Sequence, residues 1–237
     1  DLYDGDLRVT RPDGTLALEF AAQDYRTHIF EEALPYTYSK QVLFNDPKGE
    51  PTGYRVGPLA RVNCADAIDM PLANGELQEF KKKWGSPCKL TVMNHFARLI
   101  ELMYVAEKAM GLVADDEIAS PHVKTQVTAT PKSAIAHIEA PRGVLIHDYT
   151  VDTNGIVQKA NFIVATQHNI SAINASVKEA ATQFWGRPDD EMLNGIEFAI
   201  RCYDPCLSCS THRIGQMPME VMVSRNGVVE RTLSRRA

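Results

Sequence analysis

Nine residues near the C-terminus decide how this chain is interpreted: residues 204–212 have the sequence Asp-Pro-Cys-Leu-Ser-Cys-Ser-Thr-His. Two residues separate Cys206 from Cys209, so both thiols can reach one ion, and thiolates favour soft metals such as nickel, zinc or low-spin iron. Asp204 and His212 flank the pair and can accept or donate protons. A CxxC pair by itself also fits half of a zinc site or a thioredoxin-like redox pair, and both interpretations stay open at this point.

The composition is that of an ordinary globular protein. The chain has 237 residues, 44% of them hydrophobic and 23% charged, enough for one large domain or two small ones with a buried core. A long apolar run and a signal peptide are both missing, which favours a cytoplasmic protein without membrane insertion. The net charge of −5 argues against nucleic acid as a partner. The 5 cysteines are too few and too unevenly spaced for a disulfide framework, so free thiols or metal ligands are expected.

Three segments have the apolar periodicity of amphipathic helices. The first covers residues 91–112, with Gly111 as the expected C-terminal breaker. The second is predicted over residues 169–185 and the third over residues 189–201, which leads directly to the cysteine pair. The expected inner faces consist of Phe96, Leu99, Ile100, Met103, Tyr104 and Met110 in the first helix and Met192, Leu193, Ile196, Ala199 and Ile200 in the third.

Short antiparallel strands are expected wherever an Asx-Gly turn separates two apolar runs. Residues 25–53 have no clean period and are expected to be irregular, and Gly57-Pro58 is expected to stop any helix near it. The elements together predict an α+β fold, mainly α, with helices packed around a centre near Cys206. The predicted strand pairs are residues 7–9 with 16–20, 144–149 with 156–164, and 221–223 with 228–229.

Two stretches place arginines beside rigid turns. Residues 54–61, Tyr-Arg-Val-Gly-Pro-Leu-Ala-Arg, space two arginines so that they can point at an anionic group, although a loop with surface arginines is the alternative. Residues 140–143, Ala-Pro-Arg-Gly, place Arg142 on a close-packed turn. Pro141 fixes the backbone there, and Gly143 allows another backbone or a ligand to approach.

Four separated motifs together resemble the large subunit of nickel–iron hydrogenases. They are residues 54–61, residues 139–147 (Glu-Ala-Pro-Arg-Gly-Val-Leu-Ile-His), residues 161–166 (Asn-Phe-Ile-Val-Ala-Thr) and residues 204–212. The similarity runs from about Tyr25 to the end and is greatest to the cytoplasmic, bidirectional, NAD-reducing enzymes. It implies the helix-bundle core of that subunit with short β-hairpins, and the reversible splitting of dihydrogen into two protons and two electrons.

The resemblance also implies a role for each matching residue. In such enzymes four thiolates hold a nickel, and two of them bridge to an iron that carries cyanide and carbon monoxide. Cys206 would be a terminal nickel ligand and Cys209 a bridge, and Arg142 would lie beside Asp204 over the open coordination position, in one pocket with Cys206. Whether Arg142 acts as a base or electrostatically stays open. The pocket of the diatomic ligands would be formed by Pro141, Ala165 and Thr166, and a magnesium ion would lie near His212.

The chain departs from the family pattern in one respect. The family takes its other two thiolates from a second CxxC in its N-terminal half, whereas Cys64, Cys88 and Cys202 stand alone here. We therefore expect residues 1–212 to be the C-terminal portion of a large subunit that is inactive by itself. The implied partners are an iron–sulfur small subunit, diaphorase subunits and a nickel-dependent maturation protease.

The last residues and the overall function each have an alternative interpretation. The implied protease cuts after the histidine matching His212, so residues 213–237 are expected to be removed on maturation. An ordinary C-terminal hairpin is the alternative, and both hold if the hairpin is later cut off. The other classes considered are a zinc or thiol-redox module, a truncated subunit that only binds partners, and a non-catalytic relative such as the quinone-module subunit of respiratory complex I, against which the cysteine pair counts.

Overall fold

The computed structural model describes residues 2–127, 129, 132–210 and 219–235. In its N-terminal half the elements are β1 (Leu7–Thr10), β2 (Leu16–Phe20), α1 (Tyr25–His28), β3 (Ile29–Glu32), β4 (Gln41–Phe44), α2 (Pro58–Cys64), α3 (Pro71–Trp84) and α4 (Asn94–Val113). They are followed by β5 (Ser133–Ala140), β6 (Gly143–Val151), β7 (Val157–Ile163), α5 (Ala165–His168), α6 (Ile170–Gln183), α7 (Asp189–Arg201), α8 (Leu207–Ser210), β8 (Met219–Arg225) and β9 (Val228–Arg235).

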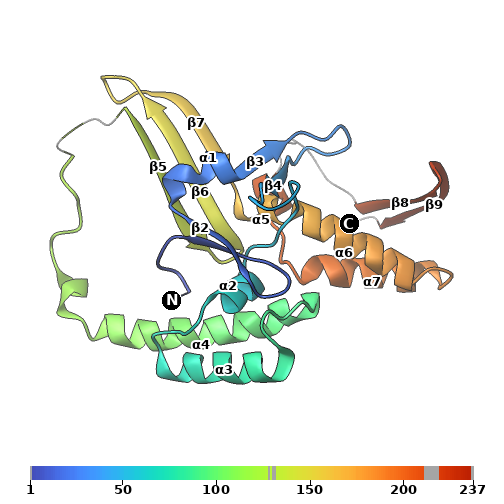
Figure 1. Ribbon diagram of the computed structural model, residues 1–237, viewed down its shortest axis with the longest axis horizontal. Coiled ribbons are helices and arrows are strands. Elements are labelled where there is room, and N and C mark those ends of the chain that lie inside the picture. The colour runs from blue at the N-terminus through green and yellow to red at the C-terminus, as the bar shows by residue number, and fades with distance from the viewer. Residues whose placement is uncertain (1, 128, 130–131, 211–218, 236–237) are drawn as a thin grey trace.

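A three-stranded antiparallel sheet in the order β5-β6-β7 rises above the helices (Figure 1). The central strand β6 pairs with β5 from Thr150 down to Gly143, which lies opposite Ala140. Its buried residue Ile146 packs in one apolar cluster with Val42 of the β3–β4 hairpin. The β5–β6 turn lies at the end of the sheet near α2, because Arg61 of that helix donates to the carbonyls of Ala140 and Pro141.

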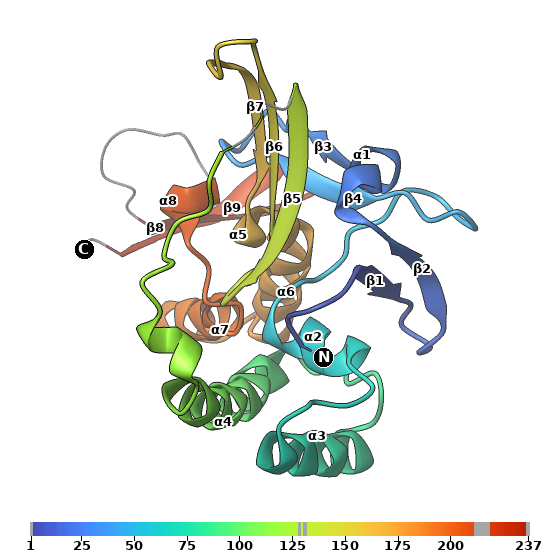
Figure 2. The ribbon, with the colours of Figure 1, turned by 90° about the vertical axis from the view of Figure 1, so that its left-hand side faces the viewer.

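The long helices form two groups below the sheet, with α6 and α7 in one and α3 and α4 in the other (Figure 2). Helices α2, α3 and α4 enclose one core, in which Val62 and Leu77 are fully buried. Helices α6 and α7 enclose a second core around Met192 and Ile196. Helix α7 begins with three acidic residues, which stabilise the positive end of its dipole, and this explains why its predicted bounds are confirmed.

The described part of the C-terminal tail, residues 219–235, is a hairpin that packs on α6 and α7. Asn226 and Gly227 have φ angles of 52° and 79°, as a tight hairpin turn requires. Val223 and Leu233 are buried in the core of these two helices. The predicted strand pair is confirmed and extends beyond its predicted ends.

The predicted α+β class is confirmed, but three local predictions were wrong. Pro58 begins helix α2 instead of stopping it, because the first helical position needs no backbone N–H. Residues 25–53 contain α1 and the β3–β4 hairpin, whose short strands depend on tertiary packing. Gly111 lies inside α4, which ends at Val113.

The inner face of α4 also differs from the prediction. Ile100 and Tyr104 are buried, but Phe96, Leu99 and Met110 are 37%, 60% and 77% exposed. The core side of the helix instead includes Asn94, Ala97 and Glu101. Small and polar residues are buried there because they have specific partners, which apolar spacing does not reveal.

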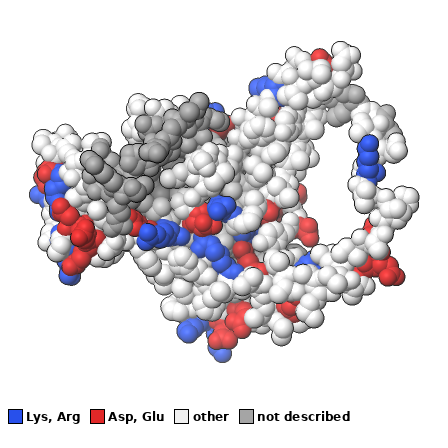
Figure 3. Space-filling model, turned by 180° about the vertical axis from the view of Figure 1, so that it is seen from behind, with Lys and Arg blue, Asp and Glu red and all other residues white. Residues whose placement is uncertain are grey.

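The surface mixes charges of both signs. Figure 3 shows Lys and Arg side chains interspersed with Asp and Glu across the back of the molecule, and the segment that follows α4 standing away from the body. Among the described residues, no helix is long and apolar enough to cross a membrane.

Candidate functional site

The turn between β5 and β6 carries Arg142. The two strands pair as far as Ala140 and Gly143, so only two residues connect them. Gly143 has a φ of 133°, and a Cβ atom there would come within 2.2 Å of the Val56 side chain. The close approach predicted from Gly143 is therefore confirmed, and the approaching backbone is the segment before α2.

Arg142 reaches from this turn to the C-terminal motif. Its Nε donates to the carbonyl oxygen of Asp204 at 2.7 Å and lies 3.2 Å from Oδ2 of the same residue. The two side chains are 41% and 53% exposed, so their ion pair contributes little to the free energy of folding. Both charged groups remain partly accessible to solvent.

Asp204 lies where the chain leaves α7. Its φ of 49° is in the left-handed region, which Asp adopts more readily than most residues. The two preceding residues are buried and anchored: the Cys202 carbonyl accepts a bond from Arg98 Nη2 at 2.8 Å, and the Tyr203 hydroxyl lies 2.9 Å from that of Ser176. These contacts fix the start of the C-terminal motif.

Helix α5 anchors the next part of the motif. The backbone N–H of Cys206 donates to Oγ1 of Thr166 at 3.0 Å. Thr166 is 2% exposed and Ala165 is 6% exposed, so this side of the site is closed to solvent. The structure thus brings together residues from the β5–β6 turn, helix α5 and the segment after α7: Pro141, Arg142, Ala165, Thr166, Asp204 and Cys206.

The cysteine pair lies at the short helix α8. Cys206 precedes this helix and Cys209 is within it, with Cα atoms 5.4 Å apart and the two sulfurs joined as a disulfide. The pair is therefore in its oxidised form here, which its spacing within one helical turn permits, and only the reduced pair could bind a metal as thiolates. Cys64, Cys88 and Cys202 are free, as expected. The same proximity suits two thiolates on one soft ion.

These two thiols are an incomplete ligand set. The part of the chain that the structure describes contains no group of three or more His, Cys, Asp or Glu side chains suited to a metal ion. The cysteine pair could therefore supply two of the four thiolate ligands of such a centre. The other two ligands would have to come from another part of the protein. His212, the predicted neighbour of a magnesium ion, lies outside the described residues.

Two buried polar residues, His168 and Asn169, hold the segment that packs against the β5–β6 turn. His168 is 1% exposed, and its Nδ1 is hydrogen-bonded to the Tyr54 hydroxyl. Burial lowers the pKa of His168 to about 4, so its imidazole is neutral at neutral pH. The adjacent Asn169 accepts a bond from the Val56 backbone N–H at 2.9 Å and donates to the Val56 carbonyl at 3.2 Å. These two residues fix the segment that packs on Gly143.

Arg61, expected to point at an anionic group, forms ion pairs with Glu101 and Glu139. Sequence reasoning did not single out Glu101 or Asn169. Glu101 gave no signal, because it lies one position after Ile100 and so about 100° around the helix from it, outside the predicted apolar stripe. Asn169 gave none either, since its two bonds are to backbone groups that are distant in sequence.

The chain is similar to known proteins in both sequence and fold. The sequence model of the family described as nickel-dependent hydrogenase matches residues 3–212. The vhc F420-non-reducing hydrogenase of Methanococcus voltae has a subunit that is 36% identical over 98% of this chain and 51% of its own length. The beta subunit of the NAD-reducing hydrogenase HoxS of Cupriavidus necator is 35% identical over 94% of this chain and 47% of its own length.

Solved structures give the same result. An NAD+-reducing [NiFe]-hydrogenase in the H2-reduced state superposes with a TM-score of 0.82 and 34% identity, over 90% of this chain and 48% of that chain. A [NiFeSe] hydrogenase from Desulfovibrio vulgaris Hildenborough, at a TM-score of 0.61 and 19% identity over 86% of this chain and 48% of that one, is similar in fold alone. The chain spans about half the length of the curated relatives that it matches.

Proposed function

The chain belongs to the nickel-dependent hydrogenase family, and from this premise we propose that it is a portion of the catalytic large subunit of a nickel–iron hydrogenase. The proposed reaction is the reversible conversion of dihydrogen into two protons and two electrons. The observation that carries the proposal is the convergence of Arg142 and Thr166 on the segment Asp204–Cys206. In the complete protein, about twice this length, we expect a mainly helical bundle around the metal centre.

Each residue has a proposed task. Cys206 and Cys209 would hold the nickel–iron centre, which when bound supplies the redox chemistry of dihydrogen cleavage and whose iron carries cyanide and carbon monoxide. The Arg142 guanidinium is a poor base, so we assign it the electrostatic task of stabilising negative charge beside the metals. Asp204 can accept a proton at its exposed carboxylate. Pro141, Ala165 and Thr166 would form the pocket of the diatomic ligands, with magnesium near His212.

Electrons have to leave through other subunits, because the chain has no ferredoxin-like run of cysteines. We propose that an iron–sulfur small subunit takes them up and passes them to diaphorase subunits, which reduce NAD or a similar carrier in the cytoplasm. The similarity to the NAD-reducing hydrogenase of Cupriavidus necator supports this choice. Hydrogen-dependent reduction of NAD by the purified complex is the expected result, and a complex that reduces only artificial dyes would contradict it.

Cysteine variants of the complete large subunit, made with its partners, test the assignment. We expect Cys206→Ser and Cys209→Ser to lose nickel and hydrogen uptake, because each removes a thiolate ligand. Cys64→Ser is the matched control, since the Cys64 thiol is hydrogen-bonded to Thr10 and to the backbone of Arg8, away from the cysteine pair. Retention of nickel and activity in the first two variants would refute the proposal. Zinc in place of nickel would favour the thiol–zinc module, and a metal-free protein that still binds partners would favour the scaffold.

We also propose that the mature chain ends at His212 and that residues 213–237 are removed by a maturation protease. The family match, which ends at residue 212, supports this boundary. Removal changes the net charge from −5 to −8, because the tail has five arginines and two glutamates. Isoelectric focusing should therefore separate the two forms, and intact mass spectrometry should identify them. Active enzyme that still carries Ala237 would show that the tail is a permanent part of the protein.

A further inference from the structure

Building on the proposed function, we propose that Arg61 is a positioning residue for the reaction. It fixes the turn that carries Arg142 and thereby sets where the Arg142 guanidinium lies beside Asp204 and the cysteine pair. Among the described residues assigned to the metal centre, Arg61 has a hydrogen bond to the carbonyl of Pro141.

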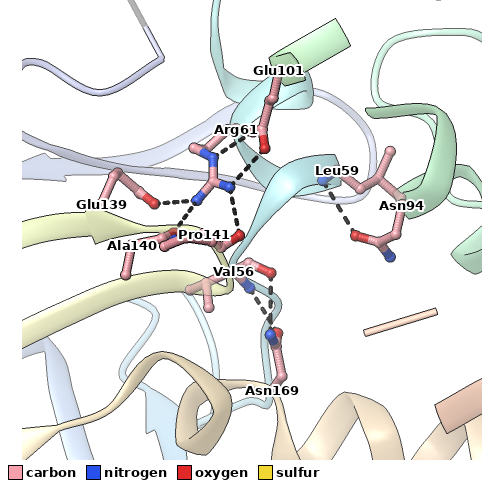
Figure 4. Close-up of polar contacts among 9 residues, drawn as sticks. All are labelled: Val56, Leu59, Arg61, Asn94, Glu101, Glu139, Ala140, Pro141 and Asn169. Atoms are coloured by element: carbon pink, nitrogen blue, oxygen red, sulfur yellow. Dashed lines mark hydrogen bonds and ion pairs between the residues drawn. The ribbon is translucent and has the colours of Figure 1, made fainter. Parts of the chain in front are cut away.

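Every N–H group of the Arg61 guanidinium has an acceptor (Figure 4). Nε and Nη2 donate to the two carboxylate oxygens of Glu101 at 2.6 and 2.9 Å, and Nη1 donates to Glu139 Oε2 at 2.6 Å. The two remaining bonds go to the backbone carbonyls of Ala140 and Pro141, both at 2.9 Å. A guanidinium has five donors in a rigid fork, so Arg61 links α4, β5 and the turn with no donor left over.

The group is buried and permanently charged. The Arg61 side chain is 3% exposed, Glu101 is 9% exposed and Glu139 is 17% exposed. Burial opposes the charge of Arg61, but the hydrogen bonds of Glu101 and the charges of both carboxylates outweigh burial and raise its pKa above the ordinary value. Buried ion pairs seldom add net stability compared with apolar packing. The arrangement is therefore better explained by the geometry that it imposes on the turn.

The turn has no freedom on either side of Arg142. Pro141, whose carbonyl Arg61 binds, directly precedes it, and Gly143 directly follows it against Val56. The Arg142 carbonyl itself lies so close to Gly57 that a Cβ atom there would be 2.9 Å away. The guanidinium of Arg142 is thus held at its backbone by these contacts and at its tip by Asp204. Loss of the hydrogen bonds from the Arg61 guanidinium to the carbonyls of Ala140 and Pro141 would free the backbone next to Arg142.

A lysine at position 61 separates positioning from simple charge compensation. Arg61→Lys keeps the positive charge beside Glu101 and Glu139, but an ammonium has three donors and cannot reproduce the fork. If Arg61 only neutralises the carboxylates, Arg61→Lys preserves the site. If Arg61 positions the turn, the Ala140 and Pro141 carbonyls lose their donors and the Arg142 side chain moves.

The first readout is the Nε–H resonance of Arg142 in the 15N-labelled full chain, assigned by its loss in Arg142→Lys. We expect Arg61→Lys to make exchange of this proton with water at least about tenfold faster, which corresponds to the loss of one ordinary hydrogen bond. Arg187→Lys is the control, because Arg187 is 66% exposed and pairs with the surface residue Glu191. An unchanged Arg142 resonance in folded Arg61→Lys would overturn the proposal.

A second variant covers the case in which Arg61→Lys does not fold. Glu101→Gln keeps one oxygen acceptor but turns an amide N–H₂ group toward Nη2, so the fork is disturbed while Glu139 remains paired with Arg61. We expect a smaller change of the Arg142 resonance in the same direction. No change in folded Glu101→Gln would equally overturn the proposal.

The second readout is the reaction itself, in the complete enzyme with its partner subunits. Arg61→Lys should lower kcat for hydrogen uptake by about tenfold to a hundredfold, since small displacements of a charged group are costly in rate. Nickel content and the KM for hydrogen should stay unchanged. An unchanged kcat would overturn the positioning role. If the protein binds no nickel and does not react with hydrogen, the proposed function fails, whereas the resonance of Arg142 still reports separately on the turn.

Discussion

The turn between β6 and β7 is stabilised by its own residues, whereas the turn between β5 and β6 is held by residues far away in the sequence. In the first turn, Asp152 Oδ1 accepts bonds from the backbone N–H groups of Asn154 and Ile156 at 2.8 and 3.0 Å. In the second turn, the backbone carbonyls are bound by Arg61 of α2. Both turns close strands of one sheet, and the β6–β7 turn lies at the end of the sheet away from the helices (Figure 1).

The difference concerns what each turn can be used for. A turn that closes on itself keeps its shape whatever the rest of the molecule does, but it cannot place a side chain accurately relative to another element. The β5–β6 turn is held by two other parts of the chain, Arg61 and the segment around Val56, which also contact α4 and the start of α6. Arg142 is carried by the turn that distant parts of the chain hold in place.

The largest expected effect comes from removing the cation that holds the β5–β6 turn. Arg61→Met should lower the free energy of unfolding by about 3–5 kcal/mol, because Glu101 and Glu139 remain buried without a positive partner. Arg187→Met breaks only an exposed ion pair and should cost about 0–1 kcal/mol. Urea unfolding of both variants measures the difference. Similar losses would mean that the buried pairs do not hold the turn.

Alanine at the corresponding glycines compares the two turns directly. Gly143→Ala should destabilise the protein by about 3 kcal/mol, since its φ of 133° is rarely adopted by L residues and the new Cβ would meet Val56. Gly155 has a φ of 80°, in the left-handed region, and Gly155→Ala should cost about 1 kcal/mol. Thermal unfolding reports both values. Equal shifts in Tm would show that the two turns are under equal constraint.

Acid should destabilise the protein through His168. This residue is hydrogen-bonded to Tyr54, which is two residues before the Val56 that packs against the β5–β6 turn. The pKa of His168 falls from 6.5 to about 4 on folding, so between these pH values the unfolded chain binds a proton that the folded chain does not. Stability from this source is complete above pH 6.5 and decreases by about 3 kcal/mol as the pH drops to 4.

The variant His168→Gln lacks this proton. The difference in unfolding free energy between the wild type and His168→Gln should therefore shift by about 3 kcal/mol in favour of the variant between pH 7 and pH 4. Urea titrations at a series of pH values measure it. A difference that stays constant over this range would mean that His168 titrates alike in the folded and unfolded chains.

The smallest effect is expected at the self-contained turn. Asp152→Ala removes the acceptor of two backbone bonds at a half-buried position and should cost about 1 kcal/mol. It should leave the Nε–H resonance of Arg142 unchanged, because the β6–β7 turn does not contact the β5–β6 turn through any bond of Asp152. A changed Arg142 resonance in this variant would mean that the sheet transmits shifts from one end to the other.

Sequence reasoning succeeded where a structure is determined by nearby residues. Helix α7 was predicted with its observed bounds, because its apolar spacing, its acidic first turn and the preceding Pro188 act within about four turns of the chain. The hairpin at Asn154-Gly155 was found for the same reason. The β3–β4 hairpin was missed, because its strands of four residues each are stabilised by packing against β6 and β7.

The same distinction applies to the site. Arg142, Asp204 and Cys206 were identified through their resemblance to a family, and the contact between Arg142 and Asp204 is present. The residues that hold them in place were not identified, because Glu101 and Asn169 look ordinary in the sequence. Their importance comes from a guanidinium 40 residues away from Glu101 and from a backbone segment 113 residues away from Asn169.

Because the β8–β9 hairpin packs on α6 and α7, cleavage of the chain after His212 and release of the tail would be two separate events. A cut after His212 would leave Val223 and Leu233 buried between the two helices, so the severed peptide would stay attached after the bond is broken. A two-stranded hairpin is at best marginally stable alone in water, so a peptide that leaves would unfold and rebind slowly. Release of the severed hairpin, rather than cleavage, would then be the irreversible step. The time at which the apolar surface of α6 and α7 becomes exposed would depend on how long the severed hairpin stays bound.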